Sequence, residues 1–85
     1  MGVSLWRIDY KDTGIKLNRE LAEFLEEYFN EERCVYSLCL IDLTEKYNRD
    51  KHNLSEQTRE QITDLINYLK RISEYEDEFF DFSYG

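Results

Sequence analysis

The feature that most constrains this 85-residue chain is the absence of proline, together with a content of only three glycines. Average usage would give about four prolines at this length. Proline and glycine interrupt helices most strongly, at costs of about 3 and 1 kcal/mol in a helix interior. The composition therefore favours long uninterrupted helices, and the length predicts one small acidic domain that spans residues 1–85.

Two segments have the periodicity of helices with one buried face. One is expected to begin after Asn18 and the other after Ser55, since both residues are good N-caps. The apolar positions are Leu21, Phe24, Leu25, Tyr28 and Phe29 in the first segment, and Ile62, Leu65, Ile66, Leu69 and Ile72 in the second. The second helix is predicted to run past Ser73 into the C-terminal acidic tail.

The apolar segment from Cys34 to Leu43 is ambiguous, because its composition suits a strand while its length and flanking charges suit a buried helix. We favour the helix. Residues 3–10 alternate in polarity and, with residues 15–17, predict a hairpin or an extended arm around a turn at residues 11–14. The expected fold is mainly α, a three-helix bundle with a short N-terminal β-hairpin or extended arm. The alternative is an α+β fold in which Cys34 to Leu43 form a strand.

Charge is the strongest compositional signal, since 19 Asp and Glu residues oppose 11 Lys and Arg residues, a net charge of −8. Such a field repels nucleic acid and anionic membranes, so neither is expected as a direct partner, and it favours a basic protein. The alternative is that the charge only keeps a small protein in solution. An aromatic content of 15% supplies a core, unlike that of acidic disordered chains.

A row of carboxylates is expected along the exposed face of the first helix. Its members are Glu20, Glu23, Glu27 and Glu31, with no lysine or arginine between them. Their spacing of about 4.5–6 Å along the axis is similar to that of adjacent phosphates on a nucleic-acid strand. The alternative is an ordinary solvated face, with glutamates near the positive end of the helix.

Acidic and aromatic residues alternate closely in the C-terminal stretch 74–85. On a continued helix Phe79 can pack on the core, whereas Phe80, Phe82 and Tyr84 are hard to bury together. Exposed aromatics anchor interfaces, and acids steer the approach to a basic groove. The alternative is that the tail folds back over the bundle. The predicted partner-binding residues are Glu20, Glu23, Glu27, Glu31, Glu74, Tyr75, Glu76, Asp77, Glu78, Phe80, Asp81, Phe82 and Tyr84.

No catalytic, cofactor or metal site is predicted, so we expect a protein that is not an enzyme. Cys34 and Cys39 are expected to be buried, reduced and unbonded to each other. The single histidine, His52, lies in a polar segment that lacks the ligand spacing of a zinc site. No segment is apolar for long enough to span a membrane and no secretory signal is present, which predicts a cytoplasmic protein.

The run Glu74-Tyr75-Glu76-Asp77-Glu78-Phe79, in a chain this short, resembles acidic–aromatic stretches of the small acidic inhibitors made by phages. Among these inhibitors, some DNA-mimicking anti-CRISPR proteins carry a similar acidic–aromatic stretch. The resemblance implies a protein in the host cytoplasm that occupies the basic nucleic-acid channel of a defence nuclease or CRISPR effector. We expect a monomer or homodimer. The alternative function is a helical adaptor, antitoxin or immunity-type protein that binds one partner through an apolar surface.

Overall fold

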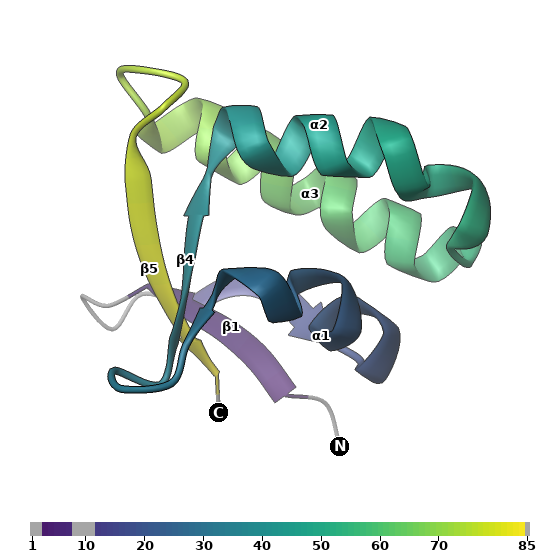
Figure 1. Cartoon of the computed structure of the whole chain (residues 1–85), viewed down its shortest axis with the longest axis horizontal. Coiled ribbons are helices and arrows are strands. Elements are labelled where there is room, and N and C mark those ends of the chain that lie inside the picture. The colour runs from purple at the N-terminus through teal and green to yellow at the C-terminus, as the bar shows by residue number, and fades with distance from the viewer. Residues whose placement is uncertain (1–2, 8–11, 85) are drawn as a thin grey trace.

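The computed structural model describes residues 3–7 and 12–84 (Figure 1). The fold is α+β, so the predicted mainly α three-helix bundle is wrong. In chain order the elements are β1 (Val3–Arg7), β2 (Asp12–Leu17), α1 (Arg19–Leu25), the 3₁₀ helix η1 (Glu26–Tyr28), β3 (Phe29–Asn30), β4 (Val35–Cys39), α2 (Leu40–Asp50), the 3₁₀ helix η2 (Lys51–Asn53), α3 (Glu56–Ile72) and β5 (Phe79–Tyr84).

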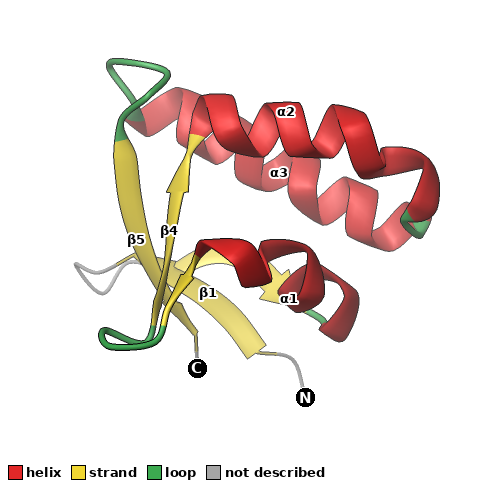
Figure 2. Ribbon diagram, in the orientation of Figure 1, coloured by secondary structure: helices red, strands yellow, loops and turns green. Residues whose placement is uncertain are grey.

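The five strands form one antiparallel sheet with the order β2-β1-β5-β4-β3. The three α-helices lie on the same side of this sheet (Figure 2). The core between the two layers is formed by fully buried side chains of the strands, with Leu5 and Phe82 among them, and of the helices, with Leu21, Ile62 and Leu65 among them. Burial of these apolar side chains is the main force that holds the layers together.

The ambiguous segment contains both kinds of structure, because β4 ends at Cys39 and α2 begins at Leu40. The predicted single helix is therefore wrong, and the alternative strand from Cys34 to Leu43 is correct only for Val35–Cys39. In β4 every side chain except Ser37 is buried. A strand buried on both faces has no polar alternation, so its sequence resembles that of a buried helix.

The C-terminal stretch does not continue the preceding helix. α3 ends at Ile72, and Ser73 is already extended, with φ −89° and ψ 133°. β5 then runs through the middle of the sheet, paired with β1 on one side and β4 on the other. Phe82 is 0% exposed, and Phe80 packs partly buried against the same core. The period of two that separates these residues is that of a strand.

Both predicted helix starts are confirmed by their caps. The Asn18 side chain accepts a hydrogen bond from the backbone N–H of Leu21 at 2.7 Å, and the Ser55 hydroxyl accepts one from Thr58 N–H at 3.3 Å. Each bond satisfies an N–H group that has no partner within its own helix. Local side-chain chemistry therefore decides where α1 and α3 begin.

The predicted N-terminal hairpin is present as β1 paired with β2, although residues 8–11 lie outside the described part of the chain. Gly14 lies inside β2 and not in a turn as predicted. Its φ is +76°, and the pairing register shifts between Ser4 and Trp6 nearby. Glycine adopts this left-handed conformation without the penalty of a Cβ, which is typical of a bulged strand.

Candidate functional site

The predicted carboxylate row on the first helix is not formed. α1 ends at Leu25, so Glu27 lies in η1 and Glu31 lies in the turn between β3 and β4. Glu23 is exposed and pairs with Arg19, with Nε and Oε1 3.3 Å apart. The row fails because the periodicity of residues 19–29 continues past the point at which the helix stops.

Two members of that row take part in the packing of the fold. Oε1 of Glu20 accepts hydrogen bonds from the hydroxyl and the N–H of Ser55, at 2.6 and 3.1 Å, and so ties α1 to the start of α3. These bonds, the hydroxyl bond foremost, lower the pKa of Glu20. Glu27 forms an ion pair with Lys46 of α2, and the hydrogen bond from Lys46 lowers the pKa of Glu27.

The predicted C-terminal binding residues are divided between core, sheet and surface. Phe82 and Phe80 belong to the core as described above, and Asp81 is held within the sheet. One Asp81 carboxylate oxygen lies 2.6 Å from Nη2 of Arg33, and the other accepts a hydrogen bond from the Ser37 hydroxyl at 2.7 Å. Tyr84 stays exposed at the end of β5. The expectation of Phe80 and Phe82 as surface anchors is therefore wrong.

The segment between α3 and β5 keeps the exposure that the sequence predicts. We call Glu74, Tyr75, Glu76, Asp77 and Glu78 the acidic loop. Four of its residues are exposed, while Glu78 is half-buried and its carboxylate accepts a hydrogen bond from Glu74 N–H at 3.0 Å. No ion pair joins these carboxylates to any side chain that the structure describes.

Exposed apolar side chains gather at the same end of the molecule as the acidic loop. Tyr75 is 68% exposed and Phe79, the next residue after the loop, is 59% exposed. Ile41, also exposed, lies close by, since its backbone N–H donates to the carbonyl of Glu76 at 3.0 Å. Ile41, Tyr75 and Phe79 therefore form an exposed apolar group beside the carboxylates of the acidic loop.

A row of carboxylates does exist, on α3, where the sequence analysis did not place one. We call Glu56, Glu60 and Asp64 the α3 row. All three are exposed, and none forms an ion pair with a described side chain. The interval of four residues puts successive members about 6 Å apart along the axis. This interval of four residues was the signal in the sequence that could have identified the row.

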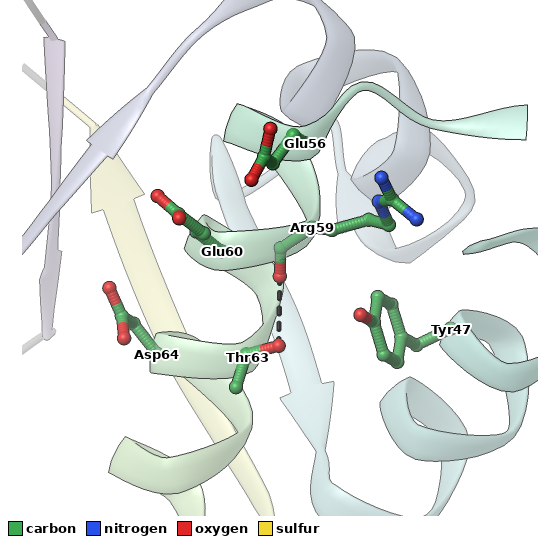
Figure 3. A pocket seen from close by; sticks show the side chains of 6 residues that line it. All are labelled: Tyr47, Glu56, Arg59, Glu60, Thr63 and Asp64. Carbon is green, nitrogen blue, oxygen red and sulfur yellow. Dashed lines mark hydrogen bonds between the residues drawn. The ribbon is translucent and has the colours of Figure 1, made fainter. Parts of the chain in front are cut away.

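The arrangement around the α3 row separates its acids from the nearby arginine. Glu56, Glu60 and Asp64 project to one side of α3, whereas Arg59 extends the other way, toward Tyr47 of α2 (Figure 3). These five residues and Thr63 line an open depression of about 460 Å³. Like charges at this interval repel by a few tenths of a kcal/mol, whereas Glu56, in the first turn of α3, is stabilised by the positive end of the helix.

The described residues contain no group of three or more His, Cys, Asp or Glu side chains placed to hold a metal ion. Both cysteines are free, as expected, but Cys34 is exposed and the prediction of its burial is wrong. Cys34 lies in the turn before β4 with a φ of 55°. Over the described part of the chain, no helix has the length and apolar character needed to cross a membrane.

Comparison of the chain with protein-family models, with curated proteins and with solved structures finds no match.

Proposed function

We propose that the protein is an acidic inhibitor that binds the basic nucleic-acid-binding cleft of a nuclease or CRISPR effector and competes there with DNA or RNA. The observation that carries the proposal is the α3 row, three exposed carboxylates on one 17-residue helix, without cationic partners among the described side chains. Their regular spacing is comparable to that of phosphates along a strand. A cationic cleft that binds phosphates accepts such a row by the same charge attraction.

The acidic loop supports the proposal from a second place on the molecule. It follows the C-terminal end of α3, whereas the α3 row occupies the first half of the helix. α3 has 17 residues and is therefore about 25 Å long. The separation between the two acidic surfaces along the helix axis is within about that length. A net charge of −8 adds long-range attraction that speeds association with a basic protein.

The experiment is a capture followed by competition. The immobilised chain is exposed to a bacterial lysate at low and high salt, captured proteins are identified, and each is then tested for displacement of labelled DNA or RNA by the free chain. Binding is expected to weaken steeply with salt, because the Debye length falls from about 10 Å at 0.1 M to about 3 Å at 1 M. Binding that ignores salt, or that leaves the nucleic acid bound, would refute the proposal.

A matched pair of variants locates the effect. The row variant carries Glu56→Gln, Glu60→Gln and Asp64→Asn, and its control carries Glu23→Gln, Glu32→Gln and Glu45→Gln, with the same change in net charge at exposed positions off the row. At about 0.5–1 kcal/mol for each charge, the row variant is expected to compete about tenfold to a hundredfold less well. Equal losses in the two variants would show that net charge alone, and not the row, produces binding.

The exposed apolar side chains favour a second candidate, an adaptor, antitoxin or immunity-type protein. In that case Ile41, Tyr75 and Phe79 anchor one partner and the acids serve mainly solubility. Truncation of Tyr75 or Phe79 to alanine is then expected to cost more than about 2 kcal/mol of binding, while the row variant binds normally. The reverse pattern supports the acidic inhibitor.

A further inference from the structure

Three aromatic rings from three different strands meet at one end of the sheet. They belong to Phe29 of β3, Tyr36 of β4 and Tyr84 of β5. The ring centroids are 5.0 Å apart for Phe29 and Tyr36, 5.9 Å for Tyr36 and Tyr84, and 6.2 Å for Phe29 and Tyr84, all in tilted arrangements. The rings line a surface depression of about 310 Å³ together with Ala22, Glu26 and Glu31. We call this depression the aromatic pocket.

The three rings are buried to different degrees, so the pocket has a floor and a wall. Tyr36 is only 7% exposed and forms part of the floor, Phe29 is half-buried, and Tyr84 is 48% exposed. Tyr84 therefore presents an accessible part of its side chain beside two rings that are more deeply buried.

Two carboxylates make the aromatic pocket strongly negative. Glu26 of η1 and Glu31 of the β3–β4 turn are both exposed, and neither has an ion pair with a described side chain. Burial raises the pKa of Tyr36, and Tyr84 and the charge of Glu26 add smaller contributions in the same direction. The faces of aromatic rings are themselves negative. The pocket is thus suited to a cation with an apolar or planar body.

We propose that the aromatic pocket binds the side chain of an arginine on the surface of the basic partner, an inference that rests on the proposed function. A guanidinium group stacks its plane on an aromatic face and at the same time donates hydrogen bonds to a carboxylate. The pocket offers both features, in Tyr84 and in Glu26 and Glu31. A lysine ammonium is a compact and strongly hydrated charge that makes less use of the ring faces.

Other occupants fit the chemistry of the pocket less well. An anion is repelled by both carboxylates. An apolar side chain would desolvate the carboxylates without forming an ion pair or a hydrogen bond with them. The α3 row and the acidic loop attract a basic partner at long range. A guanidinium group in the aromatic pocket adds a specific contact to that attraction. Such anchors are enriched in tyrosine and arginine at protein interfaces.

The test uses the isolated full chain and blocked tripeptides with arginine, citrulline or lysine at the centre. Citrulline has the shape of arginine without its charge. Titrations are followed by the NMR signals of the tyrosine and phenylalanine rings. The arginine peptide is expected to shift the pocket signals saturably and to bind about fivefold or more tighter than either other peptide. Equal binding of the citrulline peptide or of the lysine peptide would overturn the assignment.

Variants separate this pocket from the rest of the surface. Tyr84→Ala and the pair Glu26→Gln with Glu31→Gln are each expected to weaken arginine binding about fivefold or more. The control His52→Ala, at an exposed ring in η2 that does not line the pocket, is expected to leave it unchanged. Unchanged binding in Tyr84→Ala would overturn the inference. The peptide titration needs no partner protein, so it tests the aromatic pocket alone. The proposed function is tested separately, by the competition experiment with the row variant.

Discussion

Replacement of Phe82 by alanine tests the central position of β5 directly. The side chain is 0% exposed, and its ring meets that of Tyr68 edge-on with 6.1 Å between centroids. Loss of a buried phenylalanine side chain costs about 3–5 kcal/mol, through lost burial and the cavity left behind. An 85-residue domain has about 4–13 kcal/mol of total stability. The variant is therefore expected to lose between about a quarter and all of its free energy of unfolding.

Urea denaturation followed by far-UV circular dichroism measures this loss. With a slope of about 1 kcal/mol per molar urea, the midpoint is expected to fall by about 3–5 M, or the variant is unfolded from the start. Phe82→Leu keeps most of the side chain and is expected to lose only about 1–2 kcal/mol, so it remains measurable.

The matched control lies in the same strand. Phe79 is 59% exposed, and Phe79→Ala is expected to change stability by less than about 0.5 kcal/mol. If Phe79→Ala were as destabilising as Phe82→Leu, or if Phe82→Ala left the midpoint unchanged, the tail would not form a central strand. The original expectation of an exposed Phe82 would then be correct.

Three further predictions follow from individual residues. Glu20 and Glu27 have a lowered pKa in the folded state, so their contribution to stability is present above the ordinary value of 4.5 and is lost as the pH falls through the folded-state value. Glu20→Gln and Glu27→Gln should each flatten the acid side of the urea midpoint against pH, and an unchanged slope would contradict this. Exposed Cys34 is expected to react with a thiol reagent in the native protein, while buried Cys39, whose pKa is raised by burial, reacts only on unfolding, so two equally fast thiols would contradict the structure. Gly14→Ala is expected to cost about 1–2 kcal/mol, because an L-residue is strained at a φ of 76° even though an added Cβ meets nothing within 4 Å; an unshifted urea midpoint would show that the strand relaxes.

The sequence predicted that the candidate site is acidic, but it predicted the positions of the exposed carboxylates only in part. The acidic loop was found because carboxylates without neighbouring bases are visible in the sequence and a loop leaves them exposed. The row on the first helix failed because Glu20 and Glu27 find partners 35 and 19 residues away, at Ser55 and Lys46. Neutralisation across such separations depends on how the elements pack, which local spacing does not report.

The aromatic pocket was not predicted as a site, although Tyr84 and Glu31 were among the expected binding residues. Its rings come from positions 29, 36 and 84, and only the pairing of β3 and β4, and of β4 and β5, brings them together. No short stretch of the sequence contains all three residues. A constellation assembled by sheet register is therefore found only after the sheet itself is known.

The sequence by itself determined the starts of α1 and α3, the apolar face of α3 and the acidic character of the surface, since caps, periodicity and charge act between residues close together in the chain. Tertiary structure decided the fate of residues 79–84. An isolated helix satisfies its own backbone, but a strand satisfies its hydrogen bonds only beside partners, here near residues 5 and 37. β5 therefore exists because two distant strands leave a place between them that buries Phe82, and that same event places Tyr84 at the surface and leaves residues 74–78 as a loop.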